Sequence, residues 1–198
     1  MGTDCHALRT ISLPRLTLTY VLLFCVSFLP IVASQQTSDL AGSPVDPLKQ
    51  SPGRIVVLVF VRTDCPLSNR YAPLIQELSV KYAHDSSFWL VFPGKSKSLE
   101  EIRSYLQEYG YKLTALRDPE RVLAKKSEVK VTPEVAVFNA KRELIYHGRI
   151  DNLYVDFGHS RRAATTHELA DAIEAASKGV PPRVASAAGV GCFISDLQ

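Results

Sequence analysis

A cysteine followed by a proline, Cys65-Pro66, is the part of this sequence best placed to do chemistry. It comes after a continuous β-branched and aromatic run, Ile55 to Val61, which is typical of a strand buried on both faces in a parallel sheet. Pro66 suits the first position of a helix, where its missing N–H costs nothing. The pattern therefore predicts that Cys65 lies at a junction between a strand and a helix.

Such a position favours the ionised form of Cys65. Unpaired backbone N–H groups and the positive end of the helix dipole both stabilise a thiolate, which is the nucleophilic form of cysteine. We expect the pKa of this thiol to lie below its free value of about 8.5, although the neighbouring Asp64 opposes the shift. The alternative is an inert cysteine in the core, a common place for this residue type.

Export determines how many other cysteines remain. Arg9 and Arg15 precede an apolar stretch without charge, Leu16 to Ala33, which ends in small and polar residues as a secretory signal does. The competing interpretation is an uncleaved membrane anchor, because the stretch is just long enough to span a bilayer. A cleaved signal would remove Cys5 and Cys25.

Cys65 and Cys192 would then be the cysteines of the mature chain. Outside the cytosol such a pair can stay oxidised, so the mature chain could form one internal disulfide or none. A single disulfide cannot replace a hydrophobic core. The core must therefore hold the domain together.

Length and composition favour one domain with additional segments at both ends. The chain has 198 residues, of which 22% are charged, and a formal net charge of +3. It contains no clustered basic run, which argues against nucleic-acid binding. We predict a signal peptide or membrane anchor over residues 1–34, a linker over 35–53, the domain over 54–178 and a flexible tail over 179–198.

Apolar periodicity outlines the α/β domain. Beyond the first strand it predicts strands at Phe88–Phe92, Val135–Phe138 and Leu144–Tyr146. Helix-start signals follow Cys65, Ser98, Asp118 and Thr165. Pro73 should kink the first helix or end its first turn. This alternation predicts a central mixed sheet flanked by helices, with the site beyond the carboxyl ends of the strands.

Two segments carry a resemblance to a known family. The strand leading into Cys65-Pro66, together with the stretch Val131-Thr132-Pro133-Glu134-Val135, makes residues 54–148 similar to a thioredoxin-like redoxin domain. This broad group holds thiol-disulfide oxidoreductases and the alkyl hydroperoxide reductase/thiol-specific antioxidant family. The stretch Thr63 to Tyr71 resembles the signature of exported bacterial redoxins, which often end in a Gly-Cys tail like Gly191-Cys192.

The resemblance implies a thioredoxin-like fold and an exported protein, periplasmic or extracellular. It also implies that Pro133 is cis and packs beside Cys65, with the Thr132 backbone presented to a substrate peptide. Without the resemblance, only about 5–6% of X-Pro bonds are expected to be cis.

The sequence departs from the family patterns at two points. A thioredoxin-type site carries Cys-x-x-Cys, but Ser68 stands where the second cysteine would resolve a mixed disulfide. A peroxiredoxin carries Pro and Thr seven and three residues before its cysteine, and here these positions are Leu58 and Arg62. The usual peroxide pocket is therefore not expected, although Thr63 is close enough to hydrogen-bond the sulfur.

We therefore predict a thiol-disulfide oxidoreductase in which Cys65 is the nucleophile and Cys192 closes an intramolecular disulfide. A tail cysteine that pairs between chains is the alternative. The expected partners are protein or small-molecule thiols and disulfides, without a cofactor, nucleic acid, or any membrane contact beyond an uncleaved leader. The residues expected to shape the site are Thr63, Pro66, Ser68, Thr132 and Pro133.

Three other functions stay open at this point. A peroxidase-like antioxidant would consume peroxides through Cys65. A copper-handling protein would hold Cu(I) on its soft thiolates and one histidine, although His147, His159 and His167 lack metal-ligand spacing and no metal site is predicted. A redox-silent module would bind peptides on the shelf formed by Thr132-Pro133.

Overall fold

The computed structural model describes residues 37–194, so the predicted leader lies outside the described residues. The strands are β1 (Ile55–Phe60), β2 (Ser86–Pro93), β3 (Thr114–Asp118), β4 (Val131–Thr132), β5 (Glu134–Phe138), β6 (Leu144–Gly148), β7 (Tyr154–Asp156), β8 (His159–Ser160), β9 (Ser186–Ala187) and β10 (Cys192–Phe193). The helices are α2 (Pro47–Gln50), α3 (Pro66–Lys81), α4 (Leu99–Glu108), α5 (Val122–Lys126) and α6 (Glu168–Ser177). None of these helices is long and apolar enough to cross a membrane.

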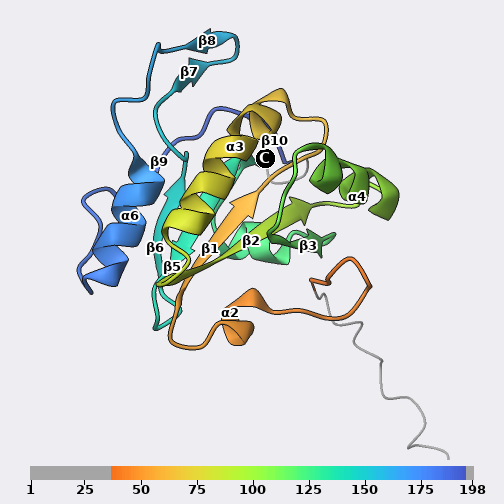
Figure 1. Cartoon of the computed structure of the whole chain (residues 1–198), viewed down its shortest axis with the longest axis horizontal. Coiled ribbons are helices and arrows are strands. Elements are labelled where there is room, and N and C mark those ends of the chain that lie inside the picture. Colours follow the sequence, from red (N-terminus) through yellow and green to blue (C-terminus); the bar gives the residue numbers. More distant parts are fainter. Residues whose placement is uncertain (1–36, 195–198) are drawn as a thin grey trace, which may run out of the picture. The chain divides into compact units, whose positions relative to one another are not determined.

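A six-stranded mixed sheet forms the centre, in the order β3-β2-β1-β5-β6-β9 (Figure 1). Strands β1, β2 and β3 run parallel, whereas β5 is antiparallel to both β1 and β6. The predicted mixed sheet flanked by helices is confirmed. Because β1 to β3 are parallel, their carboxyl ends meet at one edge of the sheet, and Cys65 follows β1 at that edge.

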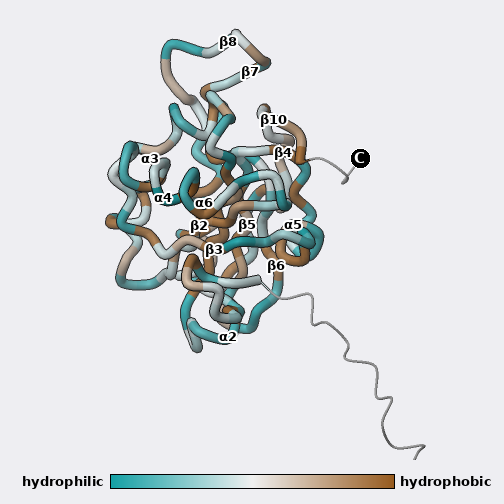
Figure 2. Tube along the Cα trace, turned by 90° about the vertical axis from the view of Figure 1, so that its right-hand side faces the viewer, coloured by the Kyte–Doolittle hydropathy of each residue, from teal (hydrophilic) through white to brown (hydrophobic). Residues whose placement is uncertain are grey.

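Alternate side chains of β1 divide between two cores. Val57 and Val59 pack with buried residues of α3, α4 and α6 on one face. Leu58 and Phe60 face the other side, where α2 and α5 cover the sheet. Burying a side chain of this type contributes about 1.5–3 kcal/mol. Figure 2 shows the result, with hydrophobic central strands inside a more hydrophilic exterior.

Helix α3 continues through Pro73, so the predicted end of a first short turn does not occur. A proline in this position removes one backbone hydrogen bond. The same helix, however, buries Tyr71, Ala72, Ile75 and Leu78 against the sheet. The burial of this face explains why the helix persists to Lys81.

The sequence prediction omits strand β3, which pairs with β2 at the border of the sheet. Its sequence, Thr-Ala-Leu-Arg-Asp, lacks the β-branched run that marks β1. As an edge strand, β3 is less completely buried by neighbouring elements and does not need such a run. Asp118 ends the strand and is fully buried. Its carboxylate accepts hydrogen bonds from the backbone N–H groups of Val122 and Ala124, which starts α5 close to the predicted position.

Residues 37–53, which the composition indicates as a linker, pack against the domain. Ser38 exchanges two backbone hydrogen bonds with Arg117 of β3, and Leu48 is buried in the core beside α5. At the other end, β9 pairs in parallel with the end of β6. This pairing needs a glycine at position 148, because a Cβ there would lie 1.9 Å from the Ala187 carbonyl oxygen.

Candidate functional site

Cys65 occupies the N-cap position of α3, directly after β1 and its short connection. Its backbone is extended, with φ −93° and ψ 111°, and its carbonyl oxygen accepts the first helical hydrogen bond from the Asn69 N–H at 3.1 Å. Pro66 is the first helical residue. The predicted junction between strand and helix is therefore confirmed.

The thiol of Cys65 is buried against the loop before β5. Its side chain has no exposed surface, and its sulfur donates a hydrogen bond to the Thr132 carbonyl oxygen at 2.9 Å. The peptide bond between Thr132 and Pro133 is cis, as the family resemblance implies. The structure thus brings together Cys65 and the segment Thr132-Pro133, which lie far apart in the sequence.

The C-terminal segment returns to this point as strand β10. Cys192 lies opposite Thr132, and Phe193 lies opposite Val131, in an antiparallel pair. The Thr132 hydroxyl donates to the Cys192 carbonyl oxygen at 3.4 Å, and the Ile194 N–H donates to the Lys130 carbonyl oxygen at 2.9 Å. Strand β10 therefore covers the segment that holds the Cys65 sulfur.

Gly191 permits this close approach. A Cβ at this position would lie 2.1 Å from the Thr132 carbonyl oxygen and 2.6 Å from its carbonyl carbon. Both are backbone atoms and cannot move aside without moving the strand. Any larger residue at position 191 is thus incompatible with the observed pairing of β10.

Two charged residues that the sequence prediction omits also fasten the C-terminal segment. Arg62 donates to the Phe193 carbonyl oxygen at 3.0 Å. Glu134, which is buried, accepts hydrogen bonds from the N–H groups of Gly189, Lys130 and Val131. The sequence does contain a signal for Glu134, because its carboxylate begins an otherwise apolar strand. A buried charge needs several hydrogen-bond partners, so such a residue is expected to hold other segments in place.

The environment of Cys65 favours the thiolate on balance. Burial opposes ionisation, but hydrogen bonds from the Cys192 thiol and from the N–H and hydroxyl of Ser68 lower the pKa of Cys65 below its ordinary value of 9.0. The Thr132 carbonyl oxygen works against this, because it accepts the proton of the neutral thiol. Burial and the neighbouring Cys65 sulfur raise the pKa of Cys192 to about 12.

Comparison with known proteins shows what the domain resembles. Residues 53–144 match a family model described as thioredoxin-like. This part of the chain is therefore similar to thioredoxin-like domains. No curated protein matches the sequence.

Solved structures agree with the thioredoxin-like fold. An uncharacterized conserved protein from Geobacillus kaustophilus is 19% identical and aligns over 80% of this chain and 86% of its own, with a TM-score of 0.68. A hypothetical protein from Sinorhizobium meliloti is 20% identical and aligns over 80% of this chain and 88% of its own, with a TM-score of 0.66. A thioredoxin-like protein from Aeropyrum pernix, 19% identical, covers 67% of this chain and 86% of its own at a TM-score of 0.50.

The remaining residues expected around this thioredoxin-like site have different surroundings. Ser68 is fully buried, and its hydroxyl accepts a hydrogen bond from the Arg62 N–H at 3.4 Å while facing the sulfur. Pro66 is exposed at the start of α3. Thr63 is half-buried, and within residues 37–194 its hydroxyl forms no hydrogen bond to Cys65. Ser68 rather than Thr63 therefore lowers the pKa of the Cys65 thiol.

Asp64 opposes the Cys65 thiolate less than its position suggests. Its carboxylate binds the Arg62 guanidinium through two hydrogen bonds and forms an ion pair with Lys97 at 3.2 Å. Partial burial opposes its ionisation, but these two cations lower its pKa. The negative charge of Asp64 is thus compensated by its own neighbours.

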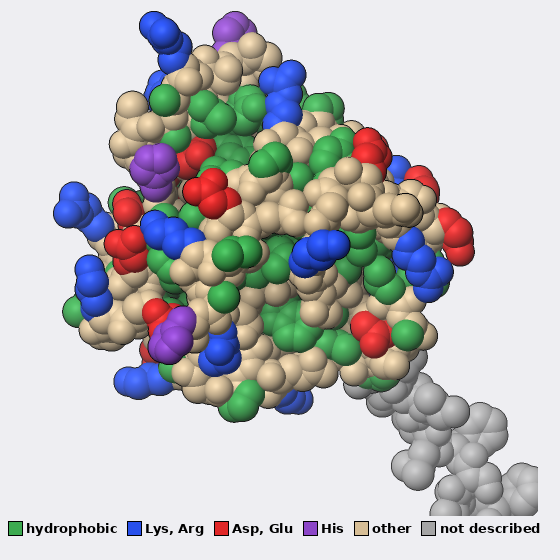
Figure 3. Space-filling view, in the orientation of Figure 1, with side chains coloured by type: hydrophobic (Ala, Val, Ile, Leu, Met, Phe, Trp, Pro, Cys, Tyr) green, Lys and Arg blue, Asp and Glu red, His purple; other side chains and the backbone are tan. Residues whose placement is uncertain are grey.

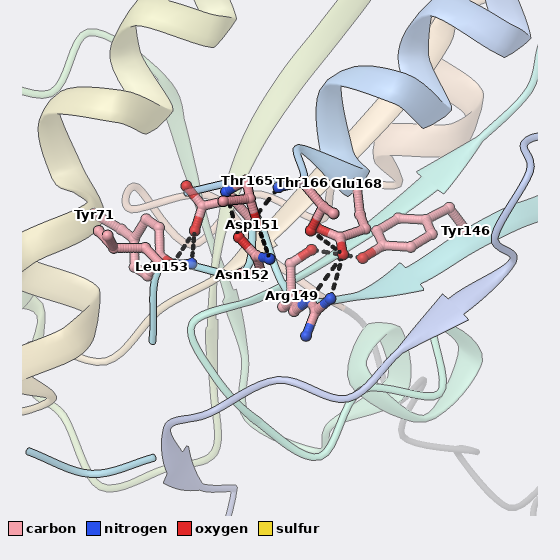
Figure 4. A network of polar contacts seen from close by, with 9 residues as sticks. All are labelled: Tyr71, Tyr146, Arg149, Asp151, Asn152, Leu153, Thr165, Thr166 and Glu168. Atoms are coloured by element: carbon pink, nitrogen blue, oxygen red, sulfur yellow. Dashed lines mark hydrogen bonds and ion pairs between the residues drawn. The ribbon is translucent and has the colours of Figure 1, made fainter. Parts of the chain in front are cut away.

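A network of polar side chains between α3 and α6 has structural partners. Asp151 accepts hydrogen bonds from the Tyr71 hydroxyl and the Leu153 N–H, and the Thr165 hydroxyl accepts one from Asn152 rather than capping α6 (Figure 4). In the same network Arg149 forms an ion pair with Glu168. Among the described residues no three His, Cys, Asp or Glu side chains are grouped so that they could hold a metal ion.

Proposed function

We propose that this thioredoxin-like protein is a thiol-disulfide oxidoreductase in which Cys65 attacks a substrate disulfide and Cys192 resolves the intermediate. The observation that carries the proposal is the antiparallel register of Cys192 with Thr132, because Thr132 also accepts the hydrogen bond of the Cys65 thiol. Both cysteines are free in this structure, which corresponds to the reduced form.

The first step uses the thiolate at Cys65. It attacks one sulfur of a disulfide R–S–S–R′, which forms a bond between Cys65 and RS and releases R′S⁻. The released thiolate takes a proton from water. The hydrogen bonds from Ser68 support this step because they favour the ionised sulfur and do not depend on β10, whereas the bond from Cys192 favours it only while β10 covers the site.

The second step uses Cys192. Once Cys65 is part of a mixed disulfide it carries no charge, so one of the causes that raise the pKa of Cys192 disappears. The Cys192 thiol loses its proton to water and attacks the Cys65 sulfur, which releases RS⁻. The protein dithiol has then lost two electrons, the substrate disulfide has become two thiols, and no organic cofactor takes part.

Access to Cys65 requires a movement of β10. The Cys65 side chain is completely buried, so no external disulfide can reach it in the observed arrangement. The contacts that close this cover lie in one short segment. They are the pairing of two-residue strands, the bond from Arg62 to Phe193, the bond from Gly189 to Glu134 and the burial of Ile194. When β10 lifts, the backbone of Thr132 becomes free to meet an extended substrate peptide.

Export belongs to the same proposal. A disulfide between Cys65 and Cys192 would persist outside the cytosol, where thiol pairs remain oxidised. The peroxidase alternative lacks support within residues 37–194, because the Thr63 hydroxyl forms no hydrogen bond to the Cys65 sulfur. The copper alternative lacks support in the same residues, because no third metal ligand lies beside the two cysteines.

Three variants test the proposal. With Cys65→Ser, exchange with a model disulfide should stop. With Cys192→Ser, the first attack should remain and a mixed disulfide on Cys65 should accumulate, visible by mass spectrometry of the intact protein. The wild-type protein should instead accumulate a Cys65–Cys192 disulfide. Undiminished exchange in Cys65→Ser would overturn the proposed function.

A further inference from the structure

The hairpin formed by β7 and β8 projects beyond the start of α3, on the same side of the molecule as Cys65 (Figure 1). It exposes two large apolar side chains, Val155 with 54% and Phe157 with 52% of their surface accessible. Large apolar side chains on a projecting segment, next to a reactive group, indicate an interaction surface more readily than scattered ones do.

The base of this hairpin is firmly held. Tyr154 packs edge-on against Tyr71 of α3, with ring centroids 5.4 Å apart. The Arg161 N–H donates to the Leu153 carbonyl oxygen at 2.8 Å, and Leu153 is in turn bonded to buried Asp151. The hairpin is therefore presented at a fixed place relative to the first turn of α3.

A small cavity separates the hairpin from that first turn. Its volume is about 130 Å³, and it is lined by Pro66, Leu67 and Arg70 of α3 and by Tyr154, Phe157, Gly158 and Ser160 of the hairpin. Pro66 is the residue after Cys65. At roughly 30 Å³ for each water molecule, the cavity has room for about four waters or one apolar side chain.

Arg70 lines the cavity, and two further arginines, Arg161 and Arg162, directly follow the hairpin residue Ser160 that also lines it. Arg70, Arg161 and Arg162 are exposed, and within residues 37–194 none of them forms an ion pair. Asp156 is the one acidic residue between positions 154 and 164, and its carboxylate accepts a hydrogen bond from the Phe157 N–H. Figure 3 shows hydrophobic side chains below the hairpin, at the top of the view, with Lys or Arg side chains and a histidine nearby.

We propose that the β7–β8 hairpin and the first turn of α3 dock a protein substrate through an acidic, apolar segment next to its disulfide. One apolar side chain of the substrate would enter the cavity, and neighbouring Asp or Glu residues would pair with Arg70, Arg161 and Arg162. This inference rests on the proposed function and names the substrate class that the site prefers.

The observations favour this partner over two others. A second copy of the chain would bring like charges together, because its hairpin carries the same arginines. An anionic membrane would match the charge and the exposed Phe157, but it would not explain a cavity sized for one side chain beside Pro66. Both remain as outcomes of the experiment.

The test uses fluorescent synthetic peptides. The first carries Leu and two Asp residues beside a central serine, the second replaces Asp by Lys, and the third replaces Leu by Ser. Fluorescence anisotropy measures binding to the full-length reduced protein without any redox step. We expect the first peptide to bind on the order of tenfold more tightly than the others at low salt, with a strong loss at high salt.

Matched variants locate the surface. The double variant R161Q/R162Q and the single variant Phe157→Ser should each reduce binding of the first peptide several-fold. K125Q/K126Q removes two adjacent exposed lysines on α5, and Val80→Ser removes an apolar side chain that is 76% exposed on α3. Both control variants should bind the first peptide as the wild type does.

A second readout separates this inference from the proposed function. The same peptides, with a cysteine activated as a mixed disulfide with 2-nitro-5-thiobenzoate in place of serine, report attack by Cys65 as release of the coloured thiolate. Preferential binding without release would overturn the proposed function and leave the docking surface intact. Release from all peptides at equal rates, with equal binding, would overturn the docking surface alone.

Two further outcomes would count against the proposed docking surface. Phosphatidylglycerol vesicles that bind through Phe157, while the peptides bind equally, would assign the hairpin to a membrane. A dimer in sedimentation that Phe157→Ser abolishes would assign it to a second copy of this chain. Either result would overturn the proposal.

Discussion

Cys192 lies opposite Thr132 in the antiparallel pair of β10 and β4, and Thr132 accepts the hydrogen bond of the Cys65 thiol. One short strand therefore does two things. It carries the thiol proposed to resolve the intermediate, and it covers the thiol proposed to form it. The proposed attack by Cys65 and the access to Cys65 would thus be coupled through the position of β10.

The pH dependence of alkylation tests the electrostatics of Cys65. Its rate should rise with pH as the thiolate forms, with a midpoint below 9.0, because the pKa of Cys65 is lowered by Cys192 and Ser68 against the effect of burial. Cys192→Ala removes the hydrogen bond that lowers the pKa of Cys65 most, so the midpoint of the alkylation rate should move to higher pH. Iodoacetamide labelling followed by peptide mass spectrometry measures both. A wild-type midpoint at or above 9.0 would contradict the prediction.

Gly191→Ala should detach β10, because the added Cβ would meet the Thr132 backbone at 2.1 Å. Formation of the Cys65–Cys192 disulfide should slow on the order of tenfold or more, since proximity of reacting groups accounts for much of such a rate. Bulky thiol reagents should reach Cys65 faster than in the wild type. Stopped-flow labelling measures both rates.

Ala188→Ser is the matched control for this change, since Ala188 is an exposed small residue of the same segment. It should leave both rates unchanged. Equal disulfide formation in Gly191→Ala and the wild type would show that β10 does not position Cys192.

Arg62→Gln should affect resolution more than attack. Arg62 donates to the Phe193 carbonyl oxygen, and its charge lowers the pKa of Cys192 against the dominant effect of burial. The variant should therefore close the internal disulfide several-fold more slowly, and a mixed disulfide should persist longer. Rapid quenching with acid, followed by mass spectrometry, resolves the two steps. Equal slowing of both steps would assign Arg62 to another role.

Tyr71→Phe should lower stability without changing redox kinetics. It removes the hydroxyl that donates to buried Asp151, while Asp151 keeps the Leu153 N–H. A hydrogen bond to a charged group contributes about 1.5–3 kcal/mol, so the free energy of unfolding should fall by about that amount. Urea denaturation measures it. Tyr154→Phe is the control, because the Tyr154 hydroxyl forms no hydrogen bond within residues 37–194, and it should be nearly neutral.

Local signals predict the centre of this fold well. The apolar run of β1 and the Cys65-Pro66 pair are close together in the sequence. The sequence alone therefore predicts correctly that the thiol lies between β1 and α3. The cis peptide before Pro133 follows only from the family resemblance, because a proline by itself does not reveal its isomer.

Features that depend on distant partners are less accessible to sequence reasoning. Arg62 and Glu134 hold the C-terminal segment through backbone atoms of residues up to 131 positions away. The apolar surroundings of Glu134 indicate that its charge needs partners, but no local pattern shows which residues these are. Strand β3 lacks a strong apolar run, since it lies at the border of the sheet. In the same way, the buried face of α3 overrides the helix-breaking tendency of Pro73.

Strand β9 makes the C-terminal segment important for solubility as well as for the site. It shields the border of the main sheet by pairing with the end of β6 at Gly148. A proteolytic cut after Gly179 would strip this shield and remove Cys192 in one event. Exposed edge strands pair with other chains. The cleaved protein would therefore aggregate, and it would not persist as a soluble protein that retains Cys65 without Cys192.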